Sequence, residues 1–131
     1  MPEQGTASAF YAEMPEDAAL ELRRWFAVEG VLAEAAAERE AQFKQWGAQE
    51  LPMGFGSPSY RQLAATMREG RDFAAKQGQV TYEQILLTAF YDVLGEPDQE
   101  KARDQLLQLI AVGVQAIQEI DRAKAASDAT E

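Results

Sequence analysis

Apolar residues of this chain recur at three- and four-residue spacing in four segments, and Gly, Pro and polar residues separate the segments. This pattern predicts four helices. The first spans residues 15–46 and the third spans 81–94. The second begins near Ser57–Ser59 and ends before Gly78, and the fourth begins around Pro97–Asp98 and ends at about residue 126. No alternating pattern predicts a strand, and no internal repeat is present. We therefore expect an all-α fold, an antiparallel helical bundle of about four helices.

Residues at the segment ends are typical of helix termini. Pro15 suits a first helical position, Thr81 suits an N-cap, and Gly47 and Gly95 suit helix ends. The stretch 47–59 is rich in Gly and Pro and predicts a connector, in which the Gly-x-Gly lacks the Gly-Lys-Ser/Thr of a phosphate loop. We expect a flexible arm over 1–14, one helical domain over 15–126 and a frayed tail over 127–131.

One face of each of the first three segments is apolar and is expected to pack inward. On the first helix, Arg39 interrupts the apolar stripe, so its guanidinium is expected to reach the edge of the stripe, pair with a carboxylate or bind an anionic ligand. Gly30 of the same helix marks a kink or break. On the second, Gly70 lies on the inner face and predicts close approach of another backbone. The inward residues are Val28, Leu32, Ala35, Phe43 and Trp46; Tyr60, Leu63, Ala64, Met67 and Ala74; and Tyr82, Ile85, Leu86, Ala89, Phe90 and Val93.

The fourth segment is apolar on nearly all sides. Residues 106–117 contain only two polar residues in twelve, Gln108 and Gln115. A helix of this kind is buried on more than one side, and in a chain this small a contact between subunits buries the second side. The sequence therefore predicts a homo-oligomer.

Composition excludes several chemistries. The 131 residues include no His and no Cys, which rules out Ser-His-Asp and Cys-His nucleophilic sites and thiolate or imidazole metal ligands. The formal net charge of −10 disfavours direct nucleic-acid binding and leaves a solvated acidic surface or a basic partner as alternatives. No apolar run reaches the roughly 18 residues of a membrane span, and the first residues lack a signal-peptide pattern, so we expect a cytoplasmic protein without membrane contact.

Polar residues at the borders of the last two helices are candidates for a metal site. Asp104, Gln108 and Gln115 fall in one strip, which is either a wet face or the lining of a cleft. Asp92 lies at the border of the third helix's inner face and needs a facing carboxylate to hold Mg²⁺, for which Asp104 is the best candidate.

A block of the first helix carries a family resemblance. Glu38-Arg39-Glu40-x-Gln42-x-Lys44-x-Trp46-Gly47-x-Gln49 resembles the Glu-Arg-x-x-Gln…Lys-Trp-Gly block of small phage and actinobacterial helical proteins. The last two helices, ILLTAFYDVLGE and ARDQLLQLIAVGVQAIQEID, look similar to theirs, and the helix order resembles the all-α nucleotide pyrophosphohydrolases of the MazG type. In total the similar blocks cover about residues 30–123.

The resemblance implies a metal-dependent activity on nucleotides. In that superfamily, Glu-x-x-Glu and Glu-x-x-Asp motifs hold Mg²⁺, which carries a nucleoside triphosphate for cleavage to monophosphate and pyrophosphate. The motifs fall on Ala89-x-x-Asp92 and Gln105-x-x-Gln108, so only Asp92 of four expected carboxylates is in place.

The residue pattern and the resemblance together give the candidate site: Asp92 and Glu38 in catalysis, Asp92 and Asp104 as metal ligands, and Arg39, Gln42, Lys44, Trp46 and Gln108 in substrate binding.

Three functions remain open at this point. The chain is a hydrolase of (deoxy)nucleoside triphosphates, or a descendant of that fold with impaired catalysis that binds a nucleotide or other phosphorylated small molecule. The locally basic segment with Arg61, Arg68, Arg71 and Lys76 favours binding. Alternatively it is a non-enzymatic acidic interaction protein, for example a phage-encoded inhibitor or nucleic-acid mimic that occupies a basic partner surface.

Overall fold

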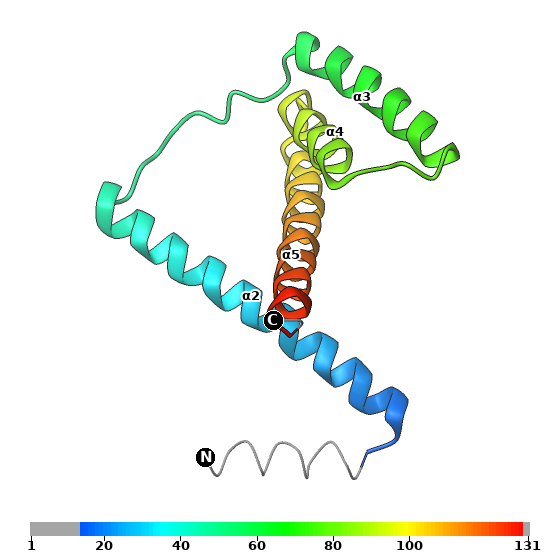
Figure 1. The fold of residues 1–131 in the computed structure, drawn as a ribbon. Helices are drawn as coiled ribbons and strands as arrows, with labels where there is room; N and C mark the ends of the chain where they lie inside the picture. Colours follow the sequence, from blue (N-terminus) through cyan, green and yellow to red (C-terminus); the bar gives the residue numbers. More distant parts are fainter. Residues whose placement is uncertain (1–13, 130–131) are drawn as a thin grey trace. The chain divides into compact units, whose positions relative to one another are not determined.

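The computed structural model describes residues 14–129, and its helices are those that the pattern predicts. Figure 1 shows α2 (Glu16–Trp46), α3 (Pro58–Lys76), α4 (Tyr82–Leu94) and α5 (Gln99–Ala129), and the described residues contain no strand. The all-α class is thus confirmed. Apart from Met14, the predicted arm over 1–14 lies outside the described residues, and α5 runs three residues beyond its predicted end.

Contacts divide the chain into two compact units, one that ends at Gly47 and one that begins at Ala48. The sequence predicts a single helical domain over 15–126, and we describe the two units separately. In the part that the structure describes, no helix combines the length and the apolar character that a membrane crossing requires.

The described part of the first unit is the helix α2. Glu16 and Asp17 lie in its first turn, where carboxylates complement the helix dipole, and Gly47 ends it at φ 70°. The helix continues through Gly30, so the chain does not break the helix there. Arg39, expected within a buried stripe, is exposed, and so are Leu32, Ala35, Phe43 and Trp46, which were expected to form that stripe.

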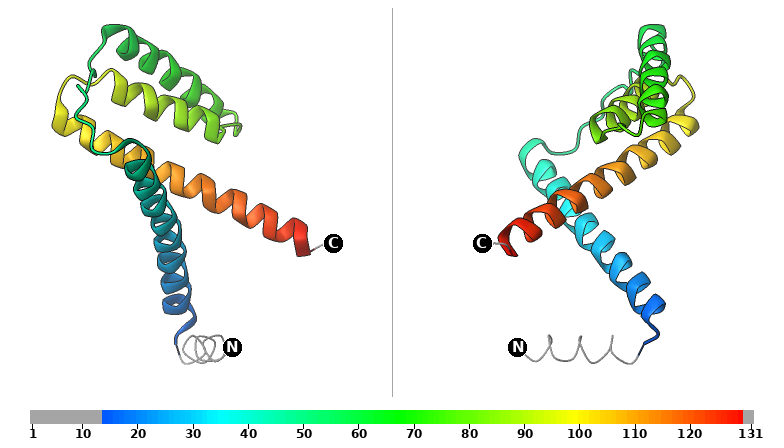
Figure 2. Two further views of the ribbon diagram at one scale, coloured as in Figure 1. Left: turned by 90° about the vertical axis from the view of Figure 1, so that its left-hand side faces the viewer. Right: turned by 45° about the vertical axis from the view of Figure 1, so that its right-hand side comes forward.

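In the second unit, α4 packs against both α3 and α5. The views of Figure 2 show α3 and α4 side by side, with the C-terminal half of α5 extending past them. The core side chains are small, which lets the helices approach closely: Ala64 and Ala74 of α3, Thr88 and Val93 of α4, and Ala102 of α5. Three residues expected to pack inward, Tyr60, Leu63 and Phe90, are each more than a third exposed because the larger rings and branches lie at the edges of this core.

The end of α4 lies close to the first turn of α3 at Gly95. A Cβ there would lie 2.6 Å from the backbone nitrogen of Arg61, the start of α3. The Arg61 Nε donates a hydrogen bond to the Gly95 carbonyl at 3.4 Å, and the Tyr60 and Tyr91 rings stack at 6.0 Å beside it. The sequence places such an approach at Gly70, which is wrong: Gly70 is exposed, and a Cβ there would meet nothing within 4 Å.

A capping box begins α4 and positions the helix that carries Asp92. The Thr81 hydroxyl accepts a hydrogen bond from the Gln84 backbone N–H, and the Gln84 side chain accepts one from the Thr81 N–H. The predicted N-cap is therefore confirmed. At the start of α5, Asp98 Oδ1 accepts hydrogen bonds from the N–H groups of Glu100 and Lys101.

Candidate functional site

A pocket of about 140 Å³ lies where the three helices of the second unit meet. The α3 helix contributes Arg71 to its lining. The other lining residues are Ile85, Ala89 and Asp92 from α4, and Gln105, Gln108 and Val112 from α5. All four positions of the two motifs that the sequence analysis singled out therefore line one pocket.

Asp92, the one carboxylate among these positions, is bound to an arginine of α3. The Arg68 Nη2 donates a short hydrogen bond to Asp92 Oδ1, and the two side chains form an ion pair. The Asp92 side chain is 25% exposed and that of Arg68 is 47% exposed. The pair links α3 to α4 at the edge of the pocket and occupies one carboxylate oxygen.

Gln105 gives the pocket an unsatisfied acceptor. Its Oε1 is buried and has no hydrogen-bond partner among the described residues. A buried amide oxygen without a donor is destabilising by about 1–3 kcal/mol. The oxygen is therefore positioned to accept a hydrogen bond from a bound water or ligand.

Arg71 gives the pocket a cation. Its Nε and Nη2 lie 3.3 and 3.2 Å from Asp72 Oδ1, and its side chain is 33% exposed against 61% for Asp72. An ion pair this open to water is weak, and water or an anion competes readily for it. A guanidinium in such a weak pair is able to exchange its carboxylate for another anion.

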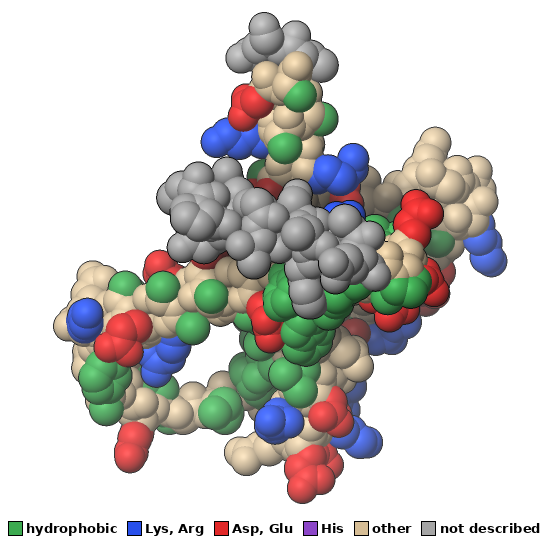
Figure 3. All heavy atoms as spheres, turned by 90° about the horizontal axis from the view of Figure 1, so that it is seen from below, with side chains coloured by type: hydrophobic (Ala, Val, Ile, Leu, Met, Phe, Trp, Pro, Cys, Tyr) green, Lys and Arg blue, Asp and Glu red, His purple; other side chains and the backbone are tan. Residues whose placement is uncertain are grey.

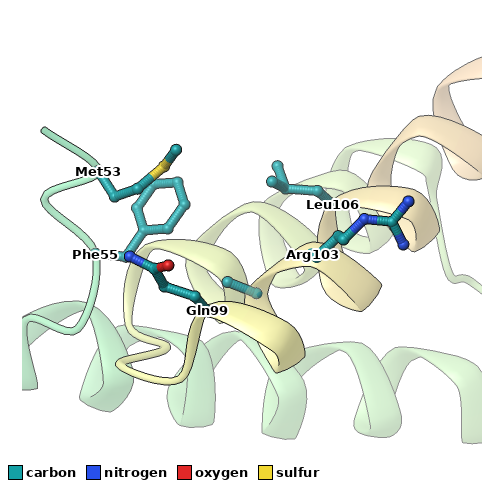
Figure 4. Close-up of a pocket in the computed structure, with 6 residues that line it drawn as sticks. Met53, Phe55, Gln99, Arg103 and Leu106 are labelled. Carbon is teal, nitrogen blue, oxygen red and sulfur yellow. The ribbon is translucent and has the colours of Figure 1, made fainter. Parts of the chain in front are cut away.

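A second pocket, of about 240 Å³, lies beside the N-terminal turns of α5 and is apolar. The connector before α3 contributes Met53 and Phe55, whose side chains face the first turns of α5 in Figure 4. Gln99, Ala102, Arg103 and Leu106 supply the α5 side of the lining. The two pockets share no lining residue, and this one has no carboxylate.

The predicted site residues fall into two groups. Of those on the last two helices, Asp92 and Gln108 meet in the first pocket, whereas Asp104 is exposed and does not line it. The other five lie on α2, in the first unit, and their part in a site stays a prediction: Glu38, Arg39, Lys44 and Trp46, which are exposed, and Gln42, which is half-buried.

Arg68, Arg71 and Gln105 belong to this site although the predicted residue set omits them. Arg68 and Arg71 are three residues apart and so share one face of α3, and Gln105 stands three residues before Gln108 on α5. This spacing was a usable signal. The sequence does not show, however, that α4 packs against both α3 and α5 and so brings these residues of α3 and α5 to one pocket.

The donor set of the pocket does not fit Mg²⁺. The ion prefers near-octahedral oxygen ligands and is usually held through one or two carboxylates, but here one carboxylate is paired with Arg68 and the other oxygens come from amides. Among the described residues, no group of three or more acidic side chains lies close enough to hold a metal ion.

Comparison of the chain with models of protein families, with curated proteins and with solved structures gives no match.

Proposed function

We propose that this protein is a MazG-like helical protein that binds a nucleotide or a related phosphorylated ligand at the pocket between α3, α4 and α5, with impaired hydrolysis. The observation that carries the proposal is the lining of that pocket. The four motif positions meet there beside Arg71, while carboxylates are missing at three of the four.

The chemistry of the pocket favours binding over cleavage. Cleavage of a phosphoanhydride needs neutralisation of phosphate oxygens and an activated water, which carboxylate-held metal ions supply in this superfamily. Ala89 offers no ligand, and the amides of Gln105 and Gln108 cannot act as general bases. Arg71 and the two amides nonetheless supply a cation, donors and acceptors for a polar ligand.

The size of the pocket limits what enters it. Ligand pockets usually measure about 300–1,000 Å³, and this one measures about 140 Å³. It therefore takes one group of the ligand, such as a base or a single phosphate, and leaves the rest outside. A base edge suits Gln105 best, because an amide oxygen accepts from an exocyclic amino group while the amide nitrogen donates to a ring nitrogen.

Calorimetric titration and thermal melting with a panel of ribo- and deoxynucleoside mono-, di- and triphosphates test the proposal. We expect a rise in melting temperature at saturating nucleotide, in EDTA as well as in Mg²⁺. A parallel assay of pyrophosphate release with Mg²⁺ or Mn²⁺ tests for catalysis, and we expect turnover near the protein-free background.

Two variants assign the binding to the pocket. Gln105→Leu removes the buried amide at similar volume and Arg71→Gln removes the cation, and each is expected to weaken binding by about ten-fold or more. Gln115→Leu is the matched control, since Gln115 is an exposed glutamine of the same helix outside the lining. No nucleotide-dependent stabilisation, or equal weakening by the control, would contradict the proposal.

A second candidate function is an acidic protein that binds a basic partner surface. It is favoured by the net charge of −10 together with large side chains of α2 that are about half-exposed: Trp25, Phe26, Phe43 and Trp46. Large exposed apolar groups near polar ones are typical of interaction surfaces. Association with a basic protein that weakens steeply with salt would support this function, and salt-independent association would oppose it.

A further inference from the structure

The α5 helix carries a second apolar stripe on the side away from α4. The stripe consists of Leu107, Ile110, Val114 and Ile117, at alternating spacings of three and four residues. Leu107 is 50% exposed, Ile110 52% and Ile117 43%. The core contact of this helix is made elsewhere, by Ala102 and by the Gln105 and Val112 side that lines the pocket with α4.

The spacing of this stripe is that of a coiled-coil seam. Apolar residues that repeat every 3.5 residues on average face a partner helix along its whole length. The same spacing continues into charged residues at both ends, Glu100 and Arg103 before the stripe and Asp121 and Lys124 after it. All four are exposed, and none makes an ion pair within residues 14–129. Figure 3 shows hydrophobic side chains reaching the surface next to charged ones.

The order of charges along the stripe matches its own reverse. Leu107 with Ile117, Ile110 with Val114, Arg103 with Asp121 and Glu100 with Lys124 all have residue 112 as their midpoint. Two copies of the helix laid antiparallel about that midpoint place apolar residues against apolar ones and each base against an acid. In a parallel pair, Arg103 would face Arg103 and Asp121 would face Asp121, which is unfavourable.

We propose that this stripe is the interface of a two-fold homodimer in which α5 of one copy packs antiparallel on α5 of a second copy, in the register set by residue 112. The occupant is a second copy because the charge pattern is complementary to itself in this direction, as an isologous interface requires. The proposal does not depend on the proposed function.

The apolar pocket at the start of α5 adds to this surface. Arg103 and Leu106, three residues apart on α5, both line this pocket. The register places residues 118–121 of the second copy beside these two residues. Ile120, 67% exposed, belongs to that segment. A large apolar side chain therefore lies near the apolar wall formed by Met53 and Phe55 (Figure 4).

Sedimentation velocity and light scattering over a wide range of protein concentration test the interface. We expect a reversible monomer–dimer equilibrium in the wild type. Ile110→Glu places a charge in the centre of the interface and is expected to raise the dimer dissociation constant by about ten-fold or more. Gln115→Glu adds the same charge at an exposed position outside the stripe and is expected to leave the constant within about two-fold.

Charge reversal tests the direction and register. Arg103→Asp and Asp121→Arg each create two like-charge contacts in the antiparallel dimer, so each weakens association by about three-fold or more at low salt. The double variant restores the opposite-charge contacts and is expected to return the constant to within about two-fold of the wild type.

Circular dichroism establishes that each variant keeps its helix content. A wild type that is monomeric at all concentrations, because another helix or another protein covers the stripe, overturns the proposal. A dimer that Ile110→Glu leaves unchanged, or in which the double reversal fails to rescue, also overturns it.

Discussion

Replacement of Gly95 by alanine tests how closely the ends of α3 and α4 meet. An added Cβ would lie 2.6 Å from the Arg61 nitrogen, 2.8 Å from its Cα and 3.1 Å from the Tyr60 carbonyl carbon. All three atoms are backbone, so no rotamer change relieves the contact. Gly95 has φ −90°, a value that alanine adopts without strain, so in the folded state the steric contact is the only perturbation.

The magnitude follows from the movement required. A 3.4 Å contact is the lower limit of ordinary packing, so the two backbones must separate by about 0.8 Å at a buried position. Overpacking of a close-packed site is destabilising by about 1–3 kcal/mol. The lower entropy of the unfolded alanine chain offsets about 0.4–1 kcal/mol of this. We expect a net loss of about 1–2 kcal/mol.

Urea and thermal unfolding followed by far-ultraviolet circular dichroism measure this loss. Tryptophan emission does not serve, because both tryptophans lie on α2, in the other unit. Gly70→Ala is the matched control: Gly70 lies inside α3, and an added Cβ meets nothing within 4 Å. It is expected to stabilise the protein by about 0.4–1 kcal/mol. A Gly95→Ala protein at least as stable as the wild type would refute the close approach.

Three further outcomes follow from hydrogen bonds and charges in the structure. Thr81→Ala removes the capping box of α4 and is expected to lower stability by about 1 kcal/mol, measured by urea unfolding, whereas the exposed Thr66→Ala is the control. Thr88→Val keeps the volume of a fully buried residue and loses only its hydrogen bond to the Gln84 carbonyl, so a loss above about 1.5 kcal/mol would contradict that account. The hydrogen bond from Arg122 holds the pKa of Glu119 below its ordinary value. The small stabilisation from this pair is therefore present above the unfolded-state pKa and is lost as the pH falls through the folded-state pKa. Glu119→Gln is expected to remove this pH dependence, measured as a flatter acid side of the plot of melting temperature against pH.

The helices were predictable because their ends are encoded locally. Thr81 with Gln84 forms a capping box, Gly47 takes a positive φ, and Pro58 begins α3. None of these features depends on distant residues. Their physical causes act within one turn of helix, so a single sequence reveals them.

The arrangement of the candidate site was less predictable because it depends on how the helices rotate against one another. The periodicity grouped Asp104 with Gln108, yet the pocket takes Gln105 and Gln108. Adjacent residues of a helix point about 100° apart. A rotation of α5 about its axis by less than this angle therefore decides whether Asp104 or Gln105 faces the pocket. Similarly, the sequence alone does not show which glycine another backbone approaches. The packing of α3 against α4 places that approach at Gly95 and not at Gly70.

The proposed relation of this pocket to a carboxylate-lined metal site is testable by introducing carboxylates at its lining positions. Ala89→Glu, Gln105→Glu and Gln108→Asp together place four carboxylates around one pocket, with Asp92 already there. Four like charges in a small half-buried site repel one another, so the triple variant is expected to be less stable than the wild type in EDTA.

A divalent cation removes this repulsion by binding to the folded state alone. Added Mn²⁺ or Mg²⁺ is therefore expected to raise the melting temperature of the triple variant and to leave the wild type unchanged. Gln115→Glu in the wild-type background, an added acid outside the pocket, serves as the control and is expected to show no cation-dependent shift. If the triple variant is equally stable with and without cation, the four side chains do not converge, and the descent of this pocket from a metal site is wrong. If it is stabilised, three substitutions are enough to make a cation site of this pocket, in which Asp92 of the wild type is paired with Arg68 instead.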